Sequence, residues 1–122
     1  MANILIFEDT ESIAKVLEIV SKRLGHNVKT YSNPFEAFDN DSFIRSADLI
    51  ISDYDMGGAT ALDLLAYLKE NNIQVKVVIN SANPSVKEFI DGAGYNDLIT
   101  GYVNKNSDIE DIQDYIKYFL EK

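Results

Sequence analysis

At 122 residues and 46% hydrophobic content, the chain has the size and composition of one compact globular domain, which excludes a disordered protein. Its 20 acidic and 11 basic residues give a formal net charge of −9, so the chain should repel nucleic-acid phosphates, and we expect no binding of nucleic acid. The absence of cysteine excludes disulfides and thiolate metal sites but does not itself fix the compartment. No apolar run approaches the roughly 20 residues that span a bilayer, so we expect no membrane segment and take a cytoplasmic location as the default.

Strand-like and helix-like segments alternate five times along the chain, with no linker or repeat between them. The strand-like runs cover residues 4–7, 27–31, 49–52, 75–79 and 99–103. Apolar side chains at helical spacing follow them over residues 13–24, from 33–36 onward, and over 62–71, 86–93 and 109–119. The second strand has one strong aliphatic residue, Val28, and we expect it at or near a sheet edge.

Three of the helices begin with residues that favour a helix start. These are Asn33 with Pro34 and Glu36, Asn83 with Pro84, and Ser107 with Glu110. In each case a side-chain oxygen at the cap position can accept a backbone N–H of the first turn, and a proline there sacrifices no helical hydrogen bond. We therefore predict Asn33, Asn83 and Ser107 as caps.

The first, third and fourth strands are apolar nearly throughout, which is typical of strands covered by helices on both faces of a parallel sheet. Five strand–helix units in this length predict an α/β fold, a doubly wound (βα)5 open parallel sheet of five strands in the flavodoxin-like topology. Eight units would be needed for a closed barrel. We expect residues 1–122 to form a single domain without an output domain.

Polar residues follow the strands of this predicted sheet. They are Glu8-Asp9 after the first strand, Asp53 after the third, Asn80-Ser81 after the fourth and Asn104-Lys105 after the fifth. All strands of a parallel sheet end at the same edge, so these side chains should converge. Polar residues end most strands, so each position alone could be coincidental, but the joint pattern predicts one pocket.

The expected pocket has the composition of a phosphoryl-transfer site. Two carboxylates about 4 Å apart repel by roughly 4 kcal/mol at an effective dielectric constant of about 20, so three of them favour a divalent cation. Oxygen ligands without His or Cys indicate Mg²⁺. Lys105 adds a positive charge, Ser81 a donor hydroxyl and Asp53 a nucleophile, while Gly57 and Gly58 would let the chain turn sharply toward the metal.

Over essentially its whole length the chain resembles the response-regulator receiver domain of two-component signalling, including its chemotaxis-type single-domain members. The matches are Glu8-Asp9, the segment DYDMGGATALDLL that begins at Asp53, Ser81-Ala82, Tyr102 three residues before the lysine, and Lys105. Each match is weak alone, but five in this order and spacing are specific.

The resemblance implies that Asp53 accepts a phosphoryl group from a phosphohistidine on a partner. It implies Mg²⁺ as the cofactor, held by Asp9, Asp53, the backbone carbonyl of Asp55 and, through water, Glu8. Beyond this self-catalysed phosphoryl acceptance and its hydrolysis, we expect no enzyme activity.

The resemblance also implies a switch. Lys105 would pair with the phosphoryl group, Ser81 would move to bond it, and Tyr102 would follow inward. These movements would change the face formed by the fourth helix, the fifth strand and the last helix. The charge and acceptor oxygens that phosphorylation adds would draw donors in the same way.

Three positions depart from the family pattern. Glu8 replaces the usual Asp with a longer arm, Gly57 stands where Pro is usual, and Asn106 stands where Pro commonly follows the lysine. The loss of each proline should loosen its loop. Asp55 and Asn83 would lie beside the entry path of water to the phosphoryl group.

We therefore expect a stand-alone receiver that is a monomer or weak dimer. Its partners would be a histidine kinase or histidine phosphotransfer protein and a downstream protein target, and onward transfer of the phosphoryl group in a relay stays open. One alternative is an interaction module with the receiver fold that no longer needs phosphate. A haloacid-dehalogenase-type phosphatase would also have an Asp-x-Asp nucleophile, but there the nucleophile precedes the acidic pair.

Tyr115 and Tyr118 lie outside the apolar stripe of the last predicted helix. With Tyr102 they could form a surface for a protein partner, or they could be ordinary, partly buried aromatic rings. The sequence leaves both interpretations open.

Overall fold

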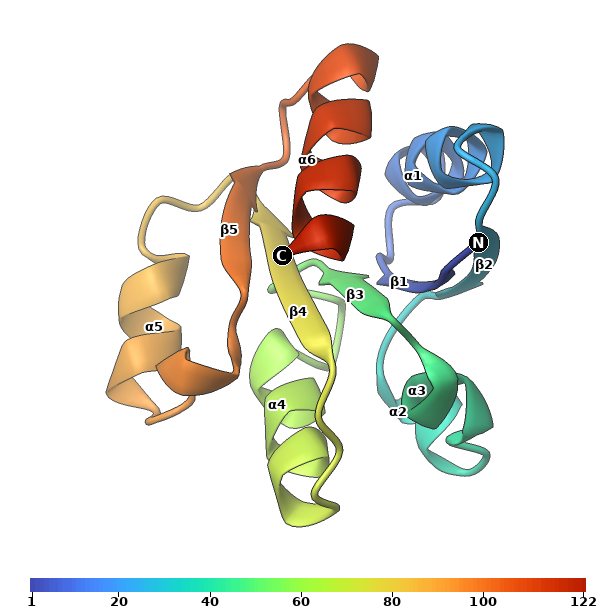
Figure 1. The fold of residues 1–122 in the computed structure, drawn as a ribbon. Coiled ribbons are helices and arrows are strands. Elements are labelled where there is room, and N and C mark those ends of the chain that lie inside the picture. Colours follow the sequence, from blue (N-terminus) through green and yellow to red (C-terminus); the bar gives the residue numbers. More distant parts are fainter.

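The computed structural model describes residues 1–122, which form one five-stranded parallel sheet with helices on both faces (Figure 1). The strands are β1 (Asn3–Phe7), β2 (Asn27–Tyr31), β3 (Leu49–Ser52), β4 (Lys76–Ser81) and β5 (Gly101–Asn104). The helices are α1 (Glu11–Arg23), α2 (Phe35–Phe38), α3 (Ser42–Ser46), α4 (Ala61–Glu70), α5 (Val86–Gly92) and α6 (Ile109–Glu121), with the short 3₁₀ helix η1 (Asn96–Leu98) before β5.

The strand order is β2-β1-β3-β4-β5, and every neighbouring pair is parallel. This order confirms the predicted doubly wound fold, and it confirms β2 as an edge strand. The strands that read as continuous apolar runs occupy the interior of the sheet, where side chains on both faces are buried.

The sheet separates two apolar layers. One layer lies between the sheet and α1 with α6; its helical members include Leu17, Val20 and Ile116. The other lies between the sheet and α2 to α5 and includes the fully buried Leu64 and Leu65 of α4. Figure 1 shows α1 and α6 together on one side of the sheet. No helix of the chain is both long enough and apolar enough to cross a membrane.

The segment after β2 differs from the prediction, because two short helices, α2 and α3, replace one longer helix. Pro34, not Asn33, is the cap of α2, and the Asn33 side-chain oxygen is buried without a hydrogen-bond partner. Glu36 does reach back as expected. Its Oε1 accepts the backbone N–H of Asn33 at 3.2 Å and that of Ser32 at 2.6 Å.

The other two predicted caps are displaced by one or two residues. Asp108 caps α6 and accepts the N–H of Asp111 at 2.9 Å, while the Ser107 hydroxyl donates to the Asn104 carbonyl at 2.6 Å. Asn83 does not cap α5; its Oδ1 accepts the N–H of Ser85 at 2.9 Å in the turn before the helix. Ser107 and Asn83 thus close the loops that precede the helices.

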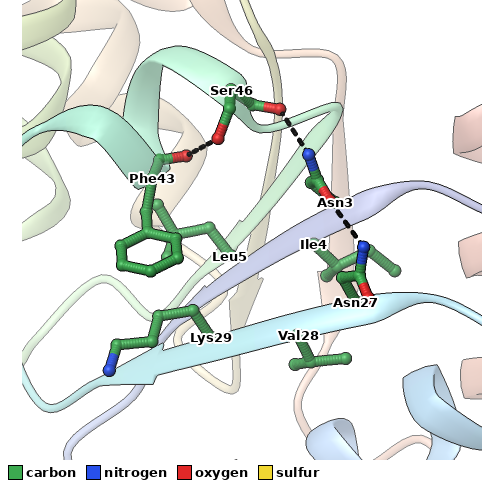
Figure 2. A pocket seen from close by; sticks show the side chains of 8 residues that line it. All are labelled: Asn3, Ile4, Leu5, Asn27, Val28, Lys29, Phe43 and Ser46. Carbon is green, nitrogen blue, oxygen red and sulfur yellow. Dashed lines mark hydrogen bonds between the residues drawn. The ribbon is translucent and has the colours of Figure 1, made fainter.

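A pocket of about 210 Å³ lies between β1, β2 and α3, away from the carboxyl ends of the strands (Figure 2). The Asn3 side chain donates to the Ser46 carbonyl at 3.1 Å, and the Asn27 side chain donates to Asn3 at 3.1 Å. Asn3 and Asn27 are the first residues of β1 and β2, so this pocket begins at the amino-terminal edge of the sheet.

The contact between β5 and α6 leaves no room for a side chain at Gly101, because a Cβ there would overlap the ring of Phe119. We expect Gly101→Ala to lower the free energy of unfolding by about 1–3 kcal/mol, as overpacking does, measured by urea denaturation. Gly92→Ala is the matched control, since a Cβ there meets no atom within 4 Å and should leave stability unchanged or slightly raised. Equal stability of both variants would contradict the prediction.

Candidate functional site

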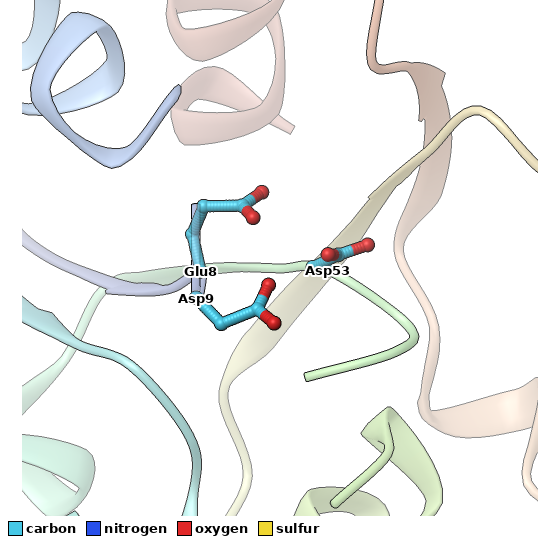
Figure 3. A group of neighbouring side chains, drawn as sticks. All are labelled: Glu8, Asp9 and Asp53. Atoms are coloured by element: carbon cyan, nitrogen blue, oxygen red, sulfur yellow. The ribbon is translucent and has the colours of Figure 1, made fainter. Parts of the chain in front are cut away.

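Three carboxylates meet where β1 and β3 end (Figure 3). Phe7 and Ser52 are register partners, so the residues that follow them, Glu8 and Asp53, leave the sheet side by side. Carboxylate oxygens of Glu8, Asp9 and Asp53 lie within 4.8 Å of one another. Glu8 and Asp53 are buried and Asp9 is exposed, so the cluster opens to solvent on the Asp9 side.

Lys105 joins this cluster from the loop after β5. Its Nζ donates to Asp53 Oδ2 at 2.7 Å and to Glu8 Oε2 at 3.1 Å. Its backbone N–H donates to the carbonyl of Ser81 at 3.3 Å, which ties the loop to the end of β4. Residues from the ends of β1, β3 and β5 therefore meet as the sequence predicted.

Asp53 is held at both carboxylate oxygens. Oδ1 accepts the backbone N–H of Tyr54 at 2.7 Å, while Oδ2 accepts from Lys105. The Tyr54 N–H was not identified from the sequence, because a backbone donor leaves no signal in residue identity. The Tyr54 ring also lies against Phe89 of α5, with ring centroids 5.7 Å apart.

The longer arm of Glu8 brings its carboxylate to Lys105. Oε2 also accepts the Thr10 N–H at 3.2 Å, whereas Oε1 is buried without a partner. Burial, and secondarily the charge of Asp53, raises the pKa of Glu8 against the opposing effects of Thr10 and Lys105. Burial acts to lower the pKa of Lys105, but the hydrogen bonds that it donates to Asp53 and Glu8, together with their negative charges, outweigh burial and raise that pKa.

The residues present fit a hard divalent cation such as Mg²⁺. Three carboxylates and one ammonium give a formal net charge of −2 in a small, partly buried volume. Every atom that could ligate a metal there is a carboxylate oxygen. The unpartnered Glu8 Oε1 can accept a hydrogen bond from a metal-bound water. Glu8, Asp9 and Asp53 are the side chains that could hold the ion.

The loop after Asp53 approaches the cluster in a conformation that needs glycine. Gly57 and Gly58 have φ of +49° and +84°, and a Cβ on Gly57 would lie 3.6 Å from Asp9 Oδ2. Proline cannot adopt a positive φ, so the departure at Gly57 belongs to a different turn rather than a looser copy of the same one. Asp55 bridges to Thr60 in this turn, and its carbonyl stays a predicted ligand.

The departure at Asn106 also has a structural counterpart. Its backbone N–H donates to the side chain of Asn104 at 2.8 Å, a hydrogen bond that proline could not make. This bond closes the turn after Lys105, where the sequence suggested a looser loop.

Ser81 and Tyr102 each make a hydrogen bond through the side-chain hydroxyl, and the two bonds have different partners. The Ser81 hydroxyl accepts the N–H of Asn83 at 3.1 Å, and the Tyr102 hydroxyl donates to the Asn96 side chain at 3.1 Å. Tyr102 is half-buried against the layer under α5, and burial, followed by the charge of Asp91, raises its pKa. A coupled movement of Ser81 and Tyr102 stays a prediction.

The ammonium of Lys105 lowers the pKa of Glu8, so its removal should raise that pKa further above the ordinary value of 4.5. We expect Lys105→Ala to shift the Glu8 carboxyl titration, followed by ¹³C NMR in metal-free protein, to higher pH. A raised folded-state pKa means that the associated stability is present at low pH and is lost as pH rises through it, so the unfolding midpoint of the variant should decrease as the pH rises above 4.5 through the raised pKa of Glu8. Lys15→Ala is the control, since Lys15 pairs with Glu18. An unchanged Glu8 titration in Lys105→Ala would contradict the assigned contact.

Comparison with known proteins places the chain in a family. The model of the response regulator receiver domain matches residues 4–117. The uncharacterized transcriptional regulatory protein YkoG of Bacillus subtilis is 30% identical over an alignment 122 residues long that covers 98% of this chain and 51% of that protein, so the chain spans about half the length of this relative.

Solved structures show the same fold. The chemotaxis response regulator CheY4 of Vibrio cholerae has a TM-score of 0.82 at 21% identity, with 98% of each chain covered. The response regulator TrrA of Thermotoga maritima, solved with Mg²⁺ and BeF, has a TM-score of 0.78 at 21% identity, covering 98% of this chain and 99% of that one. The family match, the parallel sheet and the acidic cluster agree, and the chain belongs to the response regulator receiver domain family.

Proposed function

We propose that Asp53 accepts a phosphoryl group from a phosphohistidine of a sensor kinase or histidine phosphotransfer protein, in an Mg²⁺-dependent reaction. The observation that supports this most strongly is the position of Asp53, held between the Lys105 ammonium and the Tyr54 N–H beside two further carboxylates. Family membership supports the same reaction, and a similar receiver was solved with Mg²⁺ and BeF.

In the proposed reaction a carboxylate oxygen of Asp53 attacks phosphorus. A P–O bond forms to Asp53 while the P–N bond to the donor imidazole breaks, and the imidazole leaves with the electron pair. When bound, Mg²⁺ supplies positive charge to the phosphoryl oxygens. Asp9, Asp53 and the Asp55 carbonyl would hold it, with Glu8 acting through water.

The Lys105 ammonium would change its main hydrogen-bond acceptor during the reaction. In the unphosphorylated chain its ammonium offsets Asp53 and Glu8; after transfer, the phosphoryl oxygens present the stronger acceptor. Glu8 would keep one contact to Lys105 throughout, and its longer arm gives this chain a second anchor for the ammonium.

The proposed output is a change in the face formed by α5, β5 and α6. Ser81 would leave the Asn83 N–H to bond the phosphoryl group, and Tyr102 would leave Asn96 and turn inward. On this face Tyr118 of α6 is exposed beside β5, an aromatic ring suited to a protein target. Onward transfer of the phosphoryl group to a histidine uses the same site and is the second use that we propose.

These findings bear differently on the two alternative functions, the phosphatase and the phosphate-independent interaction module. Membership of the receiver family favours a receiver over a haloacid-dehalogenase-type phosphatase. The phosphate-independent interaction module shares the fold, and the acidic cluster with Lys105 favours the phosphorylated switch over it.

Acetyl phosphate with Mg²⁺ should add one phosphoryl group to the native chain, detected by intact mass. Asp53→Asn should abolish this addition, because the amide oxygen is a poor nucleophile. Asp55→Asn should retain it, because only the backbone carbonyl of this residue is proposed to act. Addition that persists in Asp53→Asn, or a native chain that is never modified, would sink the proposal and favour the interaction module.

Beryllofluoride with Mg²⁺ should shift the NMR signals of Tyr102 and α5 in the native chain. Ser81→Ala should still bind beryllofluoride, seen at Asp53 and Lys105, but the shift at Tyr102 should fall by more than half because the hydroxyl that moves is gone. Ser85→Ala is the control, since its side chain caps no backbone group. A full Tyr102 shift in Ser81→Ala would disprove the coupling of the two residues.

A further inference from the structure

A second cavity lies behind the phosphoryl site, between α1 and α6. Its volume is about 240 Å³, and its walls come from both helices and from the ends of β4 and β5. Ile13 and Leu17 of α1 and Ile112 of α6 give it an apolar wall, and Lys105 separates it from the acidic cluster.

A buried amide forms part of this cavity. Val78 of β4 belongs to the apolar layer under α1 and α6, and side chains alternate along a strand, so Asn80 points to the same layer. Asn80 is only 3% exposed and lines the cavity; its amide pairs with no other side chain or backbone group and keeps a small opening to the cavity. Such an amide, largely removed from water, is favoured when water or a ligand in the cavity supplies its partners.

A buried hydroxyl lines the same cavity. Tyr115 of α6 contributes to its wall, and the Tyr115 hydroxyl is buried without a hydrogen-bond partner. Burial raises the pKa of this hydroxyl, so it is a neutral phenol that can donate and accept. Two unpartnered polar groups from different elements, β4 and α6, thus line one cavity.

Charge and size limit what the cavity can hold. Lys105 is the one charged residue in its lining, and its ammonium is already bonded to Asp53 and Glu8. An anion would find no free cation there, and a cation would find no carboxylate in the lining. The volume lies below the roughly 300 Å³ at which pockets for drug-sized ligands begin, which indicates a smaller molecule.

We propose that this cavity is a binding site for a small uncharged molecule with an apolar body and an amide or alcohol group. The body packs on Ile13, Leu17 and Ile112, and the polar end pairs with Asn80 and Tyr115. Apart from Lys105, which lines both, the residues of this cavity lie outside the phosphoryl-transfer site, and binding of such a molecule does not require phosphoryl transfer.

Benzamide is a suitable probe, because it joins a phenyl ring to a neutral donor–acceptor group. In metal-free protein we expect saturable NMR shifts at Asn80, Lys105 and Ile112 with a millimolar dissociation constant, and much weaker shifts with benzoate, which has the same shape and a negative charge. Asn80→Val should weaken benzamide binding about tenfold and Tyr115→Phe several-fold. Glu110→Gln, an exposed change on α6, should leave it unchanged.

The stability of the ligand-free variants gives a second readout. Asn80→Val removes an unpaired amide from an apolar layer, so its thermal midpoint should rise by roughly 2–6 °C. A fall would mean that the amide is satisfied within the chain and would overturn the proposal. Benzamide shifts that do not saturate, or that persist in Asn80→Val, would overturn it as well and leave water as the partner of both groups.

Lys105 links this cavity to the phosphoryl site, a part of the inference that rests on the proposed function. A ligand against the Lys105 stem should hold the ammonium near Asp53, so saturating benzamide should tighten beryllofluoride binding about fivefold in the native chain and not in Asn80→Val. Equal beryllofluoride affinity with and without benzamide would disprove the link. A chain that fails to bind beryllofluoride at all would instead count against the proposed function, because benzamide binding is measured without it.

Discussion

Mutual repulsion among three carboxylates is the constraint on which the site depends. Glu8, Asp9 and Asp53 are forced together because β1 and β3 are adjacent and parallel, and one lysine offsets only part of their charge. A folded chain carries this excess charge only at a cost in stability. The same cost makes the site receptive to a divalent cation, which would relieve it.

The fold was largely predictable because its signals are strong and local. Apolar strands in the interior of a parallel sheet read as continuous hydrophobic runs, and the poor hydrophobicity of β2 matched its place at the edge. The helix caps were less predictable. Ser107 and Asp108 are both good cap residues, and which of them begins α6 depends on Ser107 being engaged by the Asn104 carbonyl, a contact set by the end of β5.

The parts of the site that follow directly from the sheet topology were predictable from the sequence. Convergence of Glu8, Asp53 and Lys105 follows from parallel strands alone, whereas the fact that Lys105 bonds both acids follows from the reach of the Glu8 side chain in three dimensions. The hydrogen bond from Tyr54 to Asp53 is donated by the backbone N–H, so no residue type predicts it. Long-range packing, such as the unpaired Asn80 amide, is likewise invisible until the helices that bury it are in place.

Tyr54 has a consequence of its own, because it is fixed at both ends. Its N–H lies on the carboxylate of Asp53, and its ring lies on Phe89, which is 46% exposed on α5. A rotation of the Asp53 carboxylate that lengthens the hydrogen bond from the Tyr54 N–H would also tilt the Tyr54 ring where it contacts Phe89. The phosphorylation that we propose at Asp53 would then have a route to the outer surface that does not involve the hydroxyl of Ser81.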